Sequence, residues 1–303
     1  MIGANLSALA AFAVMLAGSG KAQDRKAESN FPFEALHAWP VALGGAGAGL
    51  HGAQFSLLNP AAIVGDHAAE VSHRATPIGA RDYAISVSFS GLWGTIHVGA
   101  RRRDWGAIAR DLGLYDLTAG EQSVSVGFAR SIGGNRVTWG ASLARLDANY
   151  LGARTGTWAF DGGTQAVVGR GFSLGIAVLQ AGRGFESETG RAPLPTRLRP
   201  GAAWQGQIGK LHLTAAGDVP FSLHRDAKPD VHMGLELRAT WGSVSAASRA
   251  GYRSLANRDG SGTREGTWAL GGGLSMGPVA ADVAYAFGAV FGDERFISLT
   301  VRW

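Results

Sequence analysis

Histidine and serine are the residues of this chain that could carry acid–base or nucleophilic chemistry, because the sequence contains no cysteine. A pair of histidines binds catalytic zinc when a His-Glu-x-x-His helix holds them one turn apart, and that spacing does not occur here. We also expect no Gly-x-Ser-x-Gly elbow between a strand and a helix. The sequence therefore predicts that the protein is not an enzyme, with no catalytic residue, no metal site and no cofactor. The histidines are His37, His51, His67, His73, His97, His212, His224 and His232.

One glycine pattern, Gly47-x-Gly49-x-x-Gly52, matches the phosphate-binding turn of dinucleotide-binding proteins. Such a turn works between a strand and a helix of a βαβ unit, and no alternation of strands and helices follows it here. We therefore expect no nucleotide site. The formal charge of +5 does not indicate nucleic-acid binding either, because the arginines are scattered and only residues 101–103 form a dense basic run.

The N-terminus has features of an export signal. Residues 6–17 are apolar, a run too short to span a bilayer but typical of the central region of a signal peptide. The residues Gly20, Lys21 and Ala22 form a plausible cleavage site, so we predict a cleaved signal peptide over 1–22. A buried helix is the alternative, because no Lys or Arg precedes the apolar run. No later stretch is long and apolar enough for a membrane-spanning helix.

Apolar and small residues alternate through the rest of the chain. Between residues 84 and 90, Ile85, Val87 and Phe89 alternate with serines, and the last residues, 297–303, alternate in the same way up to Trp303. Side chains of a strand point to opposite faces in turn, so one face of each segment is apolar. A soluble β-sandwich also alternates, but its solvent face usually carries more Lys and Glu. The small partners here favour a transmembrane barrel.

We predict about fourteen strands, an even number as bacterial barrels require. The connections predict an asymmetric barrel with its long loops outside the cell. Short glycine turns are expected near 133–135, 169–171 and 277–278, and longer loops at 105–120, 182–195, 221–229 and 256–263. By alternation His97, His212 and Asp282 face the lumen, and Arg302 shares that inner face and is the expected partner of Asp282. The expected strands are 68–75, 81–90, 93–103, 121–131, 135–147, 154–168, 171–181, 196–206, 209–218, 230–240, 243–253, 264–276, 278–287 and 293–303.

A glycine-rich segment precedes the strands. Residues 41–64 contain Gly44, Gly45 and Gly47, followed by an Asn-Pro-Ala motif at residues 59–61. Together with the Asp-Val-Ala-Tyr strand at 282–285 and the Phe-Gly-Asp turn at 291–293, this order resembles the PorV/PorQ family and, more distantly, the fatty-acid transporter FadL. The sequence departs from the family between residues 50 and 55, which carry no carboxylate, so any role of such acids does not carry over.

The resemblance implies an all-β fold, a transmembrane antiparallel β-barrel of about fourteen strands over 67–303 whose lumen is plugged by the N-terminal segment 23–66. The plug motif would be Gly44, Gly45, Gly47, Asn59, Pro60 and Ala61. A simpler interpretation is that Asn59 caps a helix and Pro60 is its first residue. We favour this interpretation over contact with a ligand. Trp303 would be the terminal aromatic that barrel-assembly machinery reads.

Two functions remain open from the sequence. PorV-like proteins serve protein secretion or surface attachment as partner-binding barrels, and this is the main prediction. The alternative is a transporter that admits hydrophobic small molecules past the plug, as FadL does. The partners expected are outer-membrane lipid, barrel-assembly machinery and either secretion-system proteins or a hydrophobic small-molecule ligand, with no nucleic acid. Both hypotheses place the mature protein in the bacterial outer membrane.

Overall fold

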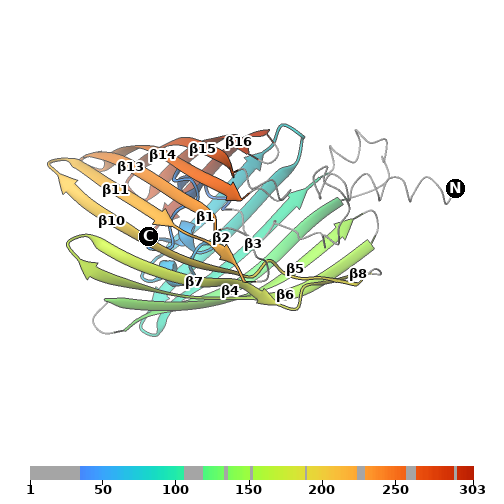
Figure 1. Cartoon of the computed structure of the whole chain (residues 1–303). Helices are drawn as coiled ribbons and strands as arrows, with labels where there is room; N and C mark the ends of the chain where they lie inside the picture. Colours follow the sequence, from blue (N-terminus) through green and yellow to red (C-terminus); the bar gives the residue numbers. More distant parts are fainter. Residues whose placement is uncertain are drawn as a thin grey trace.

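A computed structural model describes residues 35–105, 119–132, 136–150, 153–187, 190–223, 229–256, 264–289 and 292–303. Fourteen long antiparallel strands form one sheet that closes on itself, and the two-residue strand β12 (Phe221–Ser222) adds a fifteenth (Figure 1). The long strands are β1 (Ala68–Ala75), β2 (Arg81–Gly91), β3 (Gly94–Asp104), β4 (Ala119–Ile132), β5 (Val137–Tyr150), β6 (Ala153–Gly169), β7 (Phe172–Gly182), β10 (Arg197–Ile208), β11 (Leu211–Asp218), β13 (Val231–Trp241), β14 (Val244–Ala256), β15 (Arg264–Met276), β16 (Val279–Ala289) and β17 (Gly292–Arg302).

The last strand closes the barrel. β17 pairs antiparallel with β1, from Ala68 opposite Arg302 to Ala75 opposite Arg295. This pairing uses the free backbone groups of both edges, which a sheet surrounded by lipid must do because the hydrocarbon offers no hydrogen-bond partner. The predicted strands are confirmed with boundaries within three residues of those observed.

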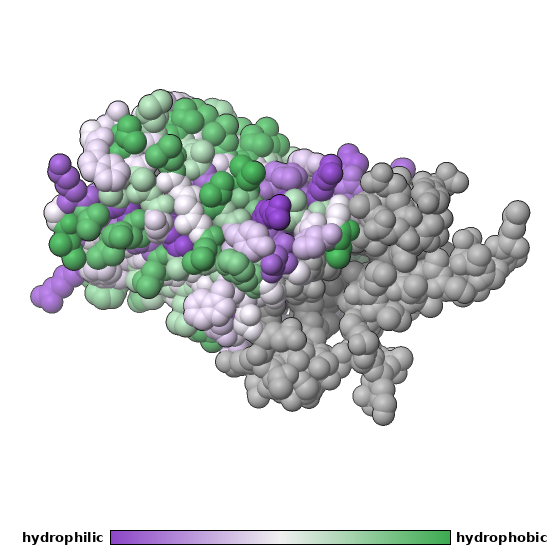
Figure 2. Space-filling view, turned by 90° about the horizontal axis from the view of Figure 1, so that it is seen from above, coloured by the Kyte–Doolittle hydropathy of each residue, from purple (hydrophilic) through white to green (hydrophobic). Residues whose placement is uncertain are grey.

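Alternation along the strands produces an apolar outer surface and a polar inner one. In β17, Ile297 is 59% exposed and Leu299 46%, whereas Ser298 and Thr300 are buried. Figure 2 shows apolar side chains spread over the outside of the barrel. Lipid tails solvate such a surface, and small inner residues leave room in the lumen. In the part of the chain that the structure describes, no helix is long and apolar enough to cross a membrane.

The two ends of the barrel differ. At one end the strands are joined by tight turns, for example at Gly209 (φ 61°), Gly242 (φ 61°) and Gly277 (φ 56°), where a left-handed backbone favours glycine. The opposite end carries the longer connections, including a hairpin of β8 (Phe185–Ser187) and β9 (Gly190–Ala192) that the sequence did not predict. Exposed tryptophans lie toward both ends of the barrel, as in the interfacial girdles of such proteins. Trp93, Trp139, Trp241 and Trp303 lie near the tight turns, and Trp158 and Trp268 lie toward the opposite end.

The segment 35–66 lies inside the barrel and is called the plug below (Figure 1). It consists of α2 (Ala38–Ala42), η2 (Ala53–Phe55), η3 (Pro60–Ile63) and the turns between them. A fourteen-stranded barrel is too wide for wall side chains to fill, so an inserted segment supplies the core. The buried core of the plug packs against Ala203 of β10 and Ala216 of β11. The plug residues of this core are Leu43, Ala46, Leu50, Phe55, Leu58 and Ala62.

Glycines on the inner wall let the plug backbone lie directly on the strands. A Cβ atom at Gly175 would be 1.9 Å from the Ala48 carbonyl oxygen, and one at Gly251 would be 2.0 Å from the Gly44 nitrogen. A Cβ at Gly163 would be 2.1 Å from Asn59 Oδ1. These distances are far below van der Waals contact, so each position must lack a side chain while the plug is seated. These wall glycines therefore serve plug docking.

Candidate functional site

The glycine-rich turn of the plug binds an anion that the barrel itself supplies. The Gly47 N–H donates to Asp218 Oδ2 at 2.8 Å, and the Ala48 N–H donates to the same oxygen at 3.1 Å. Arg199 pairs with Asp218 at 2.7 Å and also donates to the Gly45 carbonyl oxygen. Successive backbone N–H groups form an anion-binding concavity. The Gly-x-Gly-x-x-Gly pattern thus holds a carboxylate of β11, not a nucleotide phosphate.

The Asn-Pro-Ala motif fixes the other half of the plug. Asn59 caps η3 by accepting a hydrogen bond from the Ala61 N–H at 3.0 Å, and Pro60 is the first residue of that helix. The amide of Asn59 also donates to the carbonyl oxygens of Ala48 (2.9 Å) and Thr164 (3.0 Å). One side chain therefore ties together η3, the glycine turn and the wall at β6. The expected capping role is present, and a wall anchor is added to it.

α2 is held by a cluster of charged wall residues. The guanidinium groups of Arg238 and Arg249 each lie 4.7 Å from the centre of the Trp39 ring, a cation–π distance. Arg249 pairs with Glu236 and with Asp282, both at 2.6 Å. The expected Asp282–Arg302 pair is therefore wrong. Asp282 lies opposite Ser298, so Arg302 is four residues farther along β17, about 13 Å at the rise of a strand.

His37 lies at the start of α2. Its Nδ1 accepts from the Trp39 N–H at 3.2 Å, and its Nε2 is 3.1 Å from the Thr300 hydroxyl oxygen. Burial, with the charges of Arg249 and Arg302, lowers the pKa of His37 from 6.5 to about 3. The ring is therefore neutral at physiological pH, with Nδ1 as acceptor and Nε2–H as donor.

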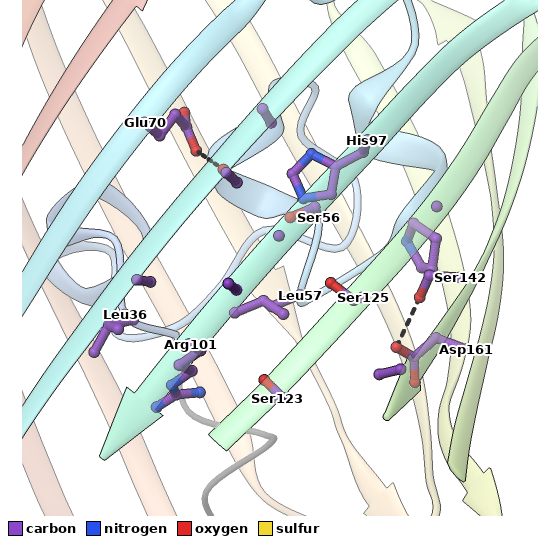
Figure 3. Close-up of a pocket in the computed structure, with 18 of the residues that line it drawn as sticks. Leu36, Ser56, Leu57, Glu70, His97, Arg101, Ser123, Ser125, Ser142 and Asp161 are labelled. Atoms are coloured by element: carbon purple, nitrogen blue, oxygen red, sulfur yellow. Dashed lines mark hydrogen bonds between the residues drawn. The ribbon is translucent and has the colours of Figure 1, made fainter. Parts of the chain in front are cut away.

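A cavity of about 100 Å³ remains between the plug and the inner faces of β1 to β7 (Figure 3). Its apolar side comes from the plug and from the wall, with Leu57 of the plug directed into the space. The apolar lining includes Leu36, Leu57, Pro60, Ile63, Ala144 and Leu146. Because most of the opposing wall residues are serine, alanine or glycine, their small side chains leave this side of the lumen unfilled. We regard this cavity as the candidate functional site.

The polar side of the cavity is formed by inward residues of neighbouring strands. Asp161 accepts from the Ser142 hydroxyl at 3.0 Å and from the Gln180 N–H at 2.6 Å, where the ladder between β6 and β7 shifts register. His97 Nδ1 is 2.9 Å from the Ser88 hydroxyl oxygen. The other polar lining residues are His37, Gln54, Ser56, Glu70, Ser72, Ser86, Arg101, Ser123 and Ser125.

The predicted lumen residues have different surroundings. His97 is buried and lines the cavity, whereas His212 lies on the inward register of β11 but is exposed beside the tight turn at residues 209–210. Alternation alone could have identified Ser142 and Asp161 as inward residues. The glutamines of the cavity have no such signal, because Gln54 belongs to the plug and Gln180 sits at a register shift with φ 59°.

The described residues of the wall show no arrangement that indicates catalysis. The letters Gly-x-Ser-x-Gly do occur, at residues 171–175 and 273–277, but in or beside antiparallel strands, without the strand-to-helix turn of a nucleophile elbow. Ser173 of the first donates to the Gly49 carbonyl oxygen at 2.7 Å and so serves plug docking. Among the described residues, no group of three or more His, Asp or Glu side chains could hold a metal ion.

Fold and lumen together define a closed β-barrel with a plugged lumen, a fold shared with solved outer-membrane channels. The CymD monoaromatic hydrocarbon channel superposes with a TM-score of 0.62 at 14% identity, over 89% of this chain and 98% of that one. The P. putida toluene transporter TodX has a TM-score of 0.58 at 11% identity, over 89% of this chain and 99% of that one. A Pseudomonas aeruginosa FadL homologue has a TM-score of 0.53 at 10% identity, over 88% of this chain and 98% of that one. No protein-family model and no curated protein matches the sequence. At these identities the likeness shows the shared fold.

Proposed function

We propose that this protein is an outer-membrane channel for small hydrophobic molecules. The observation that carries the proposal is the cavity of about 100 Å³ between the plug and the wall, with an apolar side that includes Leu57 and Leu146. An apolar cavity of about 150 Å³ binds benzene, so a space of this order suits a single ring or a short chain better than a long acyl chain. The similarity to barrels named as a monoaromatic hydrocarbon channel and a toluene transporter supports the same ligand size.

Filling the cavity tests this proposal. In Leu57→Trp a larger ring enters the cavity, so cells that express this variant should take up radiolabelled toluene no faster than cells without the protein. Leu92→Trp is the matched control, because Leu92 is 98% exposed at a tight turn. Toluene uptake at the wild-type rate in Leu57→Trp cells would contradict a route through this cavity.

Protein secretion, the main prediction from the PorV/PorQ resemblance, becomes the second candidate. The structural neighbours favour transport, because the names of CymD and TodX state channel or transporter activity. The secretion role rests on the motifs at residues 44–47 and 59–61 alone. Affinity purification after mild detergent extraction should recover a stoichiometric secretion-system partner if that role holds.

We further propose that the mature protein lies in the outer membrane, contacts its lipid and is inserted by barrel-assembly machinery that reads the strand ending at Trp303. The proposed signal peptide, residues 1–22, lies outside the described residues. Cell fractionation with N-terminal sequencing tests both points, and the expected result is an outer-membrane protein that begins at Gln23. A cytoplasmic protein that retains Met1 would overturn the proposal.

A further inference from the structure

Three buried oxygens without a hydrogen bond belong to residues that line the cavity. They are Oε1 of Glu70 on β1, Oε1 of Gln54 on η2 and Oε1 of Gln180 on β7. The three residues are 5%, 6% and 5% exposed, and none of these oxygens accepts a hydrogen bond from the part of the chain that the structure describes. His37 Nε2 lies 4.0 Å from Glu70 Oε1, beyond hydrogen-bond distance, and its hydrogen-bond partner is the Thr300 hydroxyl.

An acceptor that is buried without a partner costs about 1–3 kcal/mol, so such groups are rarely left without a donor. The three oxygens belong to residues on three different elements that line one cavity. A hydrocarbon in the cavity would supply no donor to them. A hydroxyl group would donate a hydrogen bond to one of them and keep an apolar ring against Leu57 and the other apolar lining.

We infer that this cavity selects small molecules with an apolar body and a hydrogen-bond-donating hydroxyl group, such as phenols, over plain hydrocarbons of the same size. This inference rests on the proposed channel function and narrows its ligand class. Carboxylate ligands are disfavoured, because an ionised carboxylate brings further acceptors and no hydrogen-bond donor for these oxygens. Arg101 also lines the cavity, but its guanidinium is already paired with Asp82 at 3.6 Å.

Calorimetric titration of the full-length barrel in detergent with phenol, toluene and benzoate tests the inference. Phenol should bind about tenfold more tightly than toluene, since a tenfold ratio corresponds to about 1.4 kcal/mol, the upper part of the range for the net contribution of one hydrogen bond. Benzoate should bind more weakly than phenol. Equal affinities for phenol and toluene, or tighter binding of benzoate, would overturn the inference.

Two variants assign the effect to the named oxygens. Gln54→Met and Gln180→Met keep the side-chain length but remove the acceptor, so each should weaken phenol binding about three- to tenfold and change toluene binding less than twofold. Gln122→Met is the matched control, because Gln122 is exposed on the outer face of β4. Unchanged phenol affinity in both variants, with folding verified by heat-modifiable gel mobility, would overturn the inference. If either variant misfolds, the wild-type comparison decides.

The outcomes also separate this inference from the channel function. Protein-dependent toluene uptake without a preference for phenol would refute the hydroxyl selectivity and leave the channel proposal standing. Toluene and phenol uptake that is unaffected by Leu57→Trp would refute the channel proposal itself.

Discussion

Removal of the Asp218 carboxylate should release the plug while the barrel stays intact. Asp218 is 1% exposed and Arg199 5%, and the carboxylate holds both the guanidinium of Arg199 and the N–H groups of Gly47 and Ala48. The variant Asp218→Ala leaves the Arg199 charge buried without its counter-ion. Breaking a buried ion pair from one side costs about 3–5 kcal/mol.

That cost falls on the plug, because β11 keeps its backbone ladders with β10 and β13. The free energy of plug opening should fall by the same 3–5 kcal/mol, which speeds amide exchange about a hundred- to a few-thousand-fold at a tenfold change per 1.4 kcal/mol. Hydrogen–deuterium exchange of a peptide covering residues 44–50 measures this change directly. Conductance in planar bilayers should rise in parallel.

Asp147→Ala is the matched control for Asp218→Ala. Asp147 pairs with Arg145 at 2.9 Å, but both side chains are about 40% exposed, 39% and 41%. Exposed pairs contribute about 0–1 kcal/mol, so plug exchange should not change. Wild-type exchange and conductance in Asp218→Ala would refute the reasoning, because it would mean that the apolar contacts of the plug suffice to hold it.

Two further predictions concern the seat of the plug. Gly175→Ala should lower folding yield or raise conductance, because its Cβ would be 1.9 Å from the Ala48 carbonyl oxygen. Gly272→Ala is the control, because its Cβ would make an ordinary 3.5 Å contact with the Ala247 oxygen, and it should behave as wild type in the same bilayer and gel-mobility assays. The folded pKa of His37, about 3, is below its unfolded value of 6.5, so the plug should be fully stable above pH 6.5 and lose stability as pH falls towards 3. Amide exchange of the plug measured from pH 7 to pH 4 should show this loss of stability. His37→Asn can still cap α2 but does not titrate, so it should reduce the pH dependence of plug exchange. An unchanged pH dependence in this variant would assign the effect to other groups near His37, such as Glu70.

The cavity itself could not be predicted from the sequence. Its boundary depends on how closely η2 and η3 approach the wall, and that distance is determined by glycines such as Gly163 that only the assembled barrel brings opposite Asn59. Asp282 illustrates the same limit. Alternation correctly placed it on the inner face, but its partner, Arg249, lies two strands away on β14, across Gly273 of β15.

The sequence by itself determined the strands, their inner and outer faces and the closing role of the strand that ends at Trp303, because these follow from a two-residue period and local turn chemistry. It also identified the plug through its glycine and Asn-Pro-Ala motifs. Only the tertiary structure decided that the glycine turn binds Asp218, that Asn59 anchors the plug to β6, and that a small cavity with unpaired acceptors remains. These features depend on contacts between residues more than a hundred positions apart, whose pairing is determined by strand register and the seated position of the plug.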